Sequence, residues 1–112
     1  MKIKRHKADI LFSKMIRKRD RICQFCLRNK ATQVHHHFGR SHYSVRFDFE
    51  NCVGLCGGCH IKFHSDPLLQ VEWWKKRLGK KRYQALRLKA NSYKKRDFKM
   101  AEIKLKALAG GE

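Results

Sequence analysis

Residues 34–64 of the chain, VHHHFGRSHYSVRFDFENCVGLCGGCHIKFH, decide the fold. This stretch contains three consecutive histidines at 35–37 and, near its end, two histidines spaced four residues apart. His60 and His64 fall in a segment predicted to be helical, so their imidazoles emerge on one face and can share a metal ion. The cluster at 35–37 is the available source of a third ligand. The sequence therefore predicts a histidine metal site between this cluster and the helix.

Four of the five cysteines form two C-x-x-C pairs, Cys23 with Cys26 and Cys56 with Cys59. An odd cysteine count without a secretion signal argues against disulfides, and paired C-x-x-C motifs are typical of a zinc site. Four thiolates satisfy one tetrahedral zinc, which leaves the histidines for a second, open site. Alternatively, the core histidines belong to a structural zinc cluster. We expect the fifth cysteine, Cys52, to be a small buried residue on a strand.

The patterning predicts an α+β fold for a single domain spanning residues 1–112. A helix over 6–18 is expected to place Ile10, Leu11, Lys14 and Met15 near one face. A metal-binding turn is predicted over 21–30, a strand over 31–35, a loop over 36–50, a strand over 52–55 and a helix from 57 or 58 to 64. The C-terminal part is predicted to be helical, beginning at Asp66-Pro67, with breaks at Gly79 and near Asn91-Ser92.

Charge divides the chain into three parts. The chain carries 28 Lys and Arg against 9 Asp and Glu, a formal net charge of +19. Residues 1–19 hold 8 basic and 1 acidic side chains, residues 20–66 hold 6 and 4, and residues 67–112 hold 14 and 4. The near-neutral centre, which contains every cysteine and six of the seven histidines, thus lies between two basic helical arms. This organisation predicts a chemical core with polyelectrolyte-binding segments on both sides.

A polyanion is the natural partner of so basic a chain, and nucleic acid is the first candidate. No apolar run approaches the roughly 18–20 residues that a membrane span needs, so we expect no membrane partner. The basic N-terminal sequence lacks the apolar core and the cleavage site of a signal peptide. We therefore expect a cytoplasmic protein that binds duplex DNA through backbone contacts that are largely independent of sequence. The oligomeric state stays open.

The core resembles the HNH endonuclease family, whose ββα-metal core carries His, Asn and His along a hairpin and a helix. The segment Asn51-x4-Cys56-x-x-Cys59-His60-x3-His64 is similar to the zinc-bearing branch of that family. The stretch His-His-x-Phe-Gly-Arg at 35–40 and the residues at 45–51 resemble small phage-encoded HNH proteins and, more loosely, phage nucleases of the NinG type. The resemblance covers about residues 23–64. It implies a small ββα-metal core held by a four-cysteine zinc site, and a phage-encoded protein acting in a bacterial host.

The resemblance also implies roles for individual residues. In the family the first His of the signature is the general base and the residue before it binds the metal, which gives His36 as base and His35 as ligand. His60 and His64 are implied as the other metal ligands. Asn51 is expected to orient the hairpin loop; in the Asp-bearing branch of the family the equivalent Asn binds the metal instead.

The triple histidine leaves a choice of register, because His37 could be the base and His36 the ligand. His36 precedes Asn51 by fifteen residues and Asn51 precedes His60 by nine, the spacing expected of the histidine-rich members. We therefore prefer His36 as the base. His37 is then a flanking residue that contacts solvent or phosphate.

Two arginines, Arg40 and Arg46, fall on the loop beside the expected base. A guanidinium there can hold a phosphate in a bidentate manner, so both arginines and His37 are predicted to bind DNA. The alternative for the arginines is a surface ion pair with Asp48 or Glu50.

These expectations combine into a metal-dependent HNH endonuclease that hydrolyses phosphodiester bonds by nicking or by double-strand cleavage. One structural Zn²⁺ and one catalytic divalent metal are expected. Mg²⁺, Mn²⁺, Ni²⁺ and Zn²⁺ are the candidates, and three imidazoles favour the later transition metals. The alternatives are a non-catalytic zinc-containing DNA-binding module and a phage assembly protein.

Overall fold

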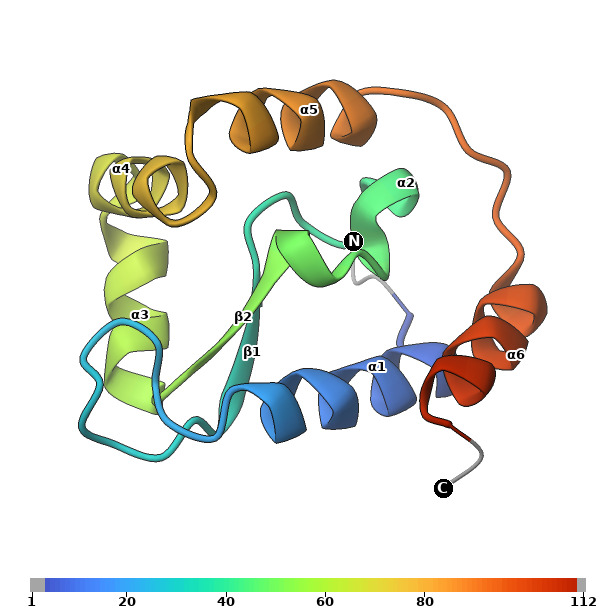
Figure 1. The fold of residues 1–112 in the computed structure, drawn as a ribbon, viewed down its shortest axis with the longest axis horizontal. Coiled ribbons are helices and arrows are strands. Elements are labelled where there is room, and N and C mark those ends of the chain that lie inside the picture. The colour runs from blue at the N-terminus through green and yellow to red at the C-terminus, as the bar shows by residue number, and fades with distance from the viewer. Residues whose placement is uncertain (1–3, 111–112) are drawn as a thin grey trace.

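A short antiparallel hairpin lies at the centre of the molecule, with helices on both faces (Figure 1). The computed structural model describes residues 4–110. The first three and last two residues of the predicted arms lie outside the described residues. In chain order the elements are α1 (Lys7–Arg19), β1 (Gln33–His36), α2 (Tyr43–Arg46), the 3₁₀ helix η1 (Phe49–Asn51), β2 (Cys52–Leu55), α3 (Gly57–Ser65), α4 (Pro67–Leu78), α5 (Lys80–Ala90) and α6 (Phe98–Leu108).

The hairpin presents different side chains to its two faces, because successive residues of a strand point in opposite directions. His35 pairs with Val53, and His36 pairs with Cys52. Val53 belongs to a core shared with α3, α4 and α5, whereas Cys52 belongs to a second core shared with α1 and α6. Cys52 is buried, as the sequence predicted. The hairpin thus separates two cores, and adjacent histidines of β1 face different helices.

The face of α1 that enters the core is formed by residues other than the four grouped from the sequence. Ala8, Phe12 and Ile16 are buried, whereas Ile10 is 45% exposed. Residues spaced by four lie along one stripe of a helix, and here that stripe packs on β2 and α6. Leu11 and Met15 lie at its margin, half-buried. Ile10 and Lys14 point to solvent, so the face named from the sequence is only partly buried.

The loop predicted over residues 36–50 contains two short elements, α2 and η1, which the sequence pattern did not indicate. Asp48 begins η1, and its side chain accepts a hydrogen bond from the Glu50 N–H. The loop brings its C-terminal end back to the strand, where the His37 N–H donates to the Asn51 carbonyl at 2.9 Å. This hydrogen bond joins the two ends of the segment between β1 and β2 and thereby fixes the end of β1.

The start of α4 and the break between α4 and α5 lie where the sequence predicted them. The Asp66 side chain accepts from the Leu69 N–H and Pro67 begins α4, while Gly79, with φ of 80°, separates α4 from α5. The last helix, α6, packs against α1, and its Leu105 is buried there. The basic C-terminal segment is therefore a part of the fold and not a detached arm. None of the helices in residues 4–110 has the length and apolarity needed to span a bilayer.

Candidate active site

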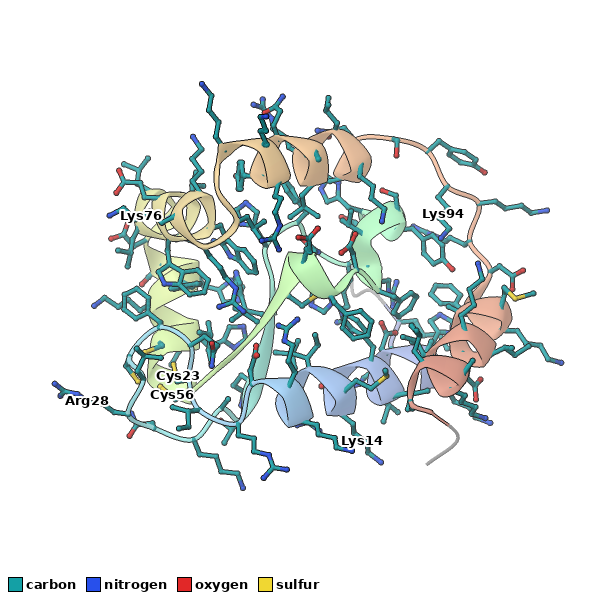
Figure 2. The ribbon with its side chains drawn as sticks, in the orientation of Figure 1. Lys14, Cys23, Arg28, Cys56, Lys76 and Lys94 are labelled. Carbon is teal, nitrogen blue, oxygen red and sulfur yellow. The ribbon has the colours of Figure 1, made fainter. Side chains whose placement is uncertain are left out.

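The four cysteines of the two C-x-x-C pairs come together at the start of α3. Cys56 is the N-cap of α3 and Cys59 lies in its first turn, while Cys23 and Cys26 come from the preceding loop, where Leu27 closes a tight turn with φ of 57°. Figure 2 shows the side chains of Cys23 and Cys56 close together at this end of the molecule. The four sulfur atoms all lie within 4.8 Å of one another, and every cysteine in residues 4–110 is a free thiol.

This arrangement fits a tetrahedral Zn²⁺. Sulfur ligands about 2.3 Å from zinc lie about 3.8 Å apart, and the Cys26 and Cys56 sulfurs are 4.0 Å apart. Backbone N–H groups of Asn29 and Arg28 lower the pKa of Cys26 to about 6. Burial and the neighbouring thiols raise the pKa of Cys59 to about 12. As thiolates, four sulfur atoms this close would need a cation between them, which a structural Zn²⁺ would supply.

The second cluster joins β1 to α3 and contains three histidines. His35 points from β1 toward α3, where its ring meets His60, Phe63 and His64 at centroid distances of 5.5, 5.2 and 5.3 Å. One ring nitrogen from each histidine lies within 4.8 Å of the others. The Nε2 atoms of His60 and His64 are 3.1 Å apart, and two imidazoles at about 2.1 Å from one ion are separated by about 3.0–3.4 Å. The three predicted ligands thus have the geometry of one metal site.

His35 is the buried member of this cluster, at 2% exposure. Burial lowers its pKa to about 4, so the ring is neutral at physiological pH and has a lone pair to offer. Its Nδ1 is buried and, within residues 4–110, has no hydrogen-bond partner. A buried ring nitrogen without a partner is costly, and a metal ion would satisfy it. The unpartnered Nδ1 atom of His35 therefore supports a metal at this place, and this evidence is independent of the sequence motif.

His36 occupies the opposite face of β1, against Phe12 of α1. Its Nε2 lies 3.1 Å from the Arg46 carbonyl oxygen, which only accepts hydrogen bonds, so the proton resides on Nε2 and Nδ1 carries the lone pair. Burial lowers its pKa to about 4. His36 is thus a neutral, oriented imidazole able to accept a proton at Nδ1.

Asn51 braces the loop that holds His36. It is fully buried. Its Oδ1 accepts from the Phe38 N–H at 2.9 Å, and its Nδ2 donates to the carbonyl oxygens of Phe38 at 2.9 Å and Val45 at 3.1 Å. The amide therefore ties the segment just after β1 to α2, an arrangement suited to the orienting role predicted for it.

A cavity of about 460 Å³ places the three-histidine cluster and His36 on one surface. The three histidines of the cluster line it together with His36. So do three arginines, Arg5, Arg17 and Arg40, of which only Arg40 was identified from the sequence. Arg17 belongs to a polar stripe of α1 spaced by four residues with Asp9 and Ser13, a pattern that could have indicated a second functional face of this helix. The cavity thus combines arginine side chains with three histidines that could hold a metal ion and with the neutral imidazole of His36.

Arg46 does not have the predicted position. It is 2% exposed and forms a bidentate ion pair with Asp9, with Nε–Oδ1 and Nη2–Oδ2 distances of 2.9 and 2.7 Å. Nη2 also donates to the Lys4 carbonyl, and the guanidinium lies over the Phe98 ring. A guanidinium with these donors engaged and buried cannot hold a DNA phosphate, so that prediction was wrong.

His37 is also turned away from the cavity. Its ring packs against Trp74 and Tyr83, its Nδ1 lies 2.7 Å from Gln70 Oε1, and its Nε2 lies 2.8 Å from the Tyr83 hydroxyl. Both ring nitrogens are engaged within the fold, so the predicted contact of His37 with phosphate was wrong. This placement leaves His36 as the histidine of the pair that lines the cavity.

A scan against family models and searches of curated proteins and of solved structures each found no match for this chain. The side chains around the cavity are therefore the basis for a functional proposal.

Proposed function

We propose that the chain is a metal-dependent DNA endonuclease of the HNH type. The observation that carries the proposal is one cavity lined by a three-histidine cluster, by the oriented neutral imidazole of His36, and by Arg5, Arg17 and Arg40. A polyanion fits the arginines, a divalent metal fits the cluster, and an imidazole with a free lone pair fits the removal of a proton.

The order of the elements supports the HNH assignment. A hairpin of β1 and β2 is followed directly by α3, which is the order of a ββα-metal core. The positions expected for His, Asn and His are occupied by His36 at the end of β1, Asn51 just before β2, and His60 in α3. The four-cysteine cluster at the start of α3 would hold a structural zinc that ties the preceding loop to this core.

Phosphodiester hydrolysis assigns a distinct task to each group. A water molecule attacks phosphorus and gives its proton to Nδ1 of His36, a new P–O bond forms, and the bond to the leaving oxygen breaks. His35, His60 and His64 would hold a divalent metal, which would supply charge stabilisation for the phosphate and the leaving oxygen. The arginines of the cavity position the phosphate, and Asn51 keeps the base aligned through the loop.

The net positive charge of the chain favours a polyanionic partner. At +19 in 112 residues, the chain repels itself unless a polyanion neutralises it. Exposed basic side chains extend well beyond the cavity, so duplex DNA would be bound mainly through its phosphates.

The test is cleavage of supercoiled plasmid by the purified protein with Mg²⁺, Mn²⁺, Ni²⁺ or Zn²⁺, with and without chelator. We expect metal-dependent cleavage that His60→Ala abolishes while the Cys-bound zinc is retained. His36→Ala should bind DNA and metal normally yet cleave about 10²–10⁴-fold more slowly in single-turnover assays, the range for loss of a general base. DNA binding without any metal-dependent cleavage would instead identify a non-catalytic zinc-containing module.

A further inference from the structure

The side chain of Gln70 in α4 connects two histidines of the triple-histidine motif. Its Oε1 lies 3.0 Å from Nε2 of His35 and 2.7 Å from Nδ1 of His37. At its other end, Nε2 lies 3.4 Å from the carbonyl oxygen of Phe63. One amide thus touches the buried member of the histidine cluster, its sequence neighbour two positions on, and the backbone of α3.

The orientation of this amide is determined by Phe63. A carbonyl oxygen only accepts hydrogen bonds, so the group of Gln70 that faces it must be the NH₂. The reversed amide would place two acceptors 3.4 Å apart and leave both without a hydrogen. Oε1 of Gln70 is therefore the atom directed at the two imidazoles.

This orientation determines where each imidazole carries its hydrogen. Because Oε1 is an acceptor, Nε2 of His35 and Nδ1 of His37 must both be protonated. Nε2 of His37 then accepts from the Tyr83 hydroxyl, 2.8 Å away. On His35, the hydrogen on Nε2 leaves the lone pair on Nδ1, the same buried atom that has no partner within residues 4–110.

We propose that Gln70 is a positioning residue for the metal site, which holds His35 in the Nε2–H form so that Nδ1 is its metal-ligating atom. The inference rests on the proposed function only in requiring a metal at the histidine cluster. A ligating histidine commonly donates its other ring N–H to an acceptor, which selects the tautomer and orients the ring. The amide of Gln70 performs this task, and Tyr83 extends the hydrogen-bond chain to α5.

The experiment compares Gln70→Leu, which removes the acceptor, with Gln70→Glu, which keeps an acceptor oxygen. Gln84→Leu, at an exposed position of α5, is the matched control. With the cysteine site loaded with zinc, Ni²⁺ is titrated calorimetrically. We expect Gln70→Leu to weaken Ni²⁺ binding by about 10–100-fold, Gln70→Glu to restore most of the affinity, and Gln84→Leu to have no effect.

A second readout reports the tautomer directly and does not depend on a variant that folds. Long-range ¹H–¹⁵N NMR spectra of the wild-type protein without Ni²⁺ should show His35 protonated at Nε2 and His37 protonated at Nδ1. Gln70→Leu should lose this preference at His35. His35 protonated at Nδ1, or unchanged Ni²⁺ affinity in Gln70→Leu, would overturn the role of Gln70 and leave the nuclease proposal intact. Failure of the wild-type protein to bind any of Mg²⁺, Mn²⁺, Ni²⁺ and Zn²⁺ at the histidines would overturn both.

Discussion

Arg46 cannot bind DNA phosphate, because it forms a buried ion pair with Asp9, which is distant in the sequence. Asp9 is 6% exposed and Arg46 is 2% exposed. Two parallel hydrogen bonds and a third to a backbone carbonyl engage three of the five N–H donors of the guanidinium. Burial of two charges is tolerated only when geometry of this quality offsets their lost hydration. The pair ties the start of α1 to the end of α2, beside the cavity.

Removal of one partner should therefore be costly. Asp9→Asn keeps the size and the hydrogen-bond acceptor but leaves Arg46 as an uncompensated buried charge, so we expect a loss of about 3–5 kcal/mol in the free energy of unfolding at pH 7. Urea unfolding followed by circular dichroism measures it. Glu102→Gln, which breaks a surface pair with Lys106, is the control and should have a small effect.

The effect of Asp9→Asn should also depend on pH. Burial alone would raise the pKa of Asp9, but hydrogen bonds from Arg46 and from the His6 N–H outweigh it and lower the pKa overall. Its stabilising contribution is therefore complete above the unfolded pKa of about 3.9 and is lost as pH falls through the lower folded value. The stability difference between the wild type and Asp9→Asn should narrow below about pH 4. A difference that stays constant or widens in acid would contradict the assignment.

Local sequence could not have identified this partner, because Asp9 and Arg46 are separated by 37 positions. The two nearby carboxylates that the sequence offers to the loop arginines pair elsewhere, Asp48 with Lys89 and Glu50 with Arg82. The partners of His37 could not be identified from local sequence either, because they lie in α4 and α5. Pairings of this kind depend on how elements dock, and the residue pattern around each position does not contain that information.

At the scale of the element, part of each candidate metal cluster could be predicted because the spacing within each pair is local. The spacing of His60 and His64 is one helical turn, and each C-x-x-C pair is complete within four residues. The bounds of α1, both strands, α3, α4 and α5 lie within about two residues of the predicted ones, whereas α6 begins only at Phe98, because residues 91–97 are not helical. The core face of α1 and the short elements α2 and η1 were not predicted, because they depend on packing against α6 and the hairpin.

The hairpin has one close contact that should be sensitive to substitution. At Gly54 in β2, an added Cβ would lie 2.9 Å from the Asp20 Cβ, 3.0 Å from the Asp20 carbonyl oxygen and 3.1 Å from the Ala31 Cβ. The Gly54 N–H also donates to the Asp20 carboxylate at 3.0 Å. These neighbouring atoms belong to the backbone or to the base of short side chains, so they cannot make room for a Cβ unless β2 moves.

Gly54→Ala should therefore destabilise the fold by about 1–3 kcal/mol, the usual cost of overpacking. It should also weaken metal binding, because Gly54 pairs with Val34, the residue before His35. Thermal unfolding and Ni²⁺ titration measure the two effects. Gly58→Ala in α3, where an added Cβ meets nothing within 4 Å, is the matched control and should be neutral or stabilising by up to about 1 kcal/mol. Equal stability of the two variants would show that β2 can shift freely.

At the scale of the whole molecule, positive charge is spread over several sides. The labelled residues Lys14, Arg28, Lys76 and Lys94 come from α1, the cysteine loop, α4 and the segment after α5, and all are exposed (Figure 2). Because α6 is packed on α1, deletion of the C-terminal segment would remove part of a core along with its charge. The electrostatic contribution of any region must therefore be tested by charge substitution.

Two triple variants with the same loss of charge test whether DNA is bound across the cavity or by positive charge anywhere on the surface. One replaces the cavity arginines Arg5, Arg17 and Arg40 with Gln. The other replaces residues 94–96, which are three exposed basic side chains outside the cavity. Each neutralised phosphate contributes about 0.9 to the slope of log K against log salt. In the slowly cleaving His36→Ala background, the cavity triple should reduce the slope for duplex DNA by about 2–3, and the 94–96 triple should reduce it much less. Fluorescence anisotropy at several salt concentrations measures both slopes. Equal reductions would mean that DNA does not lie preferentially across the cavity and is held by charge on all sides.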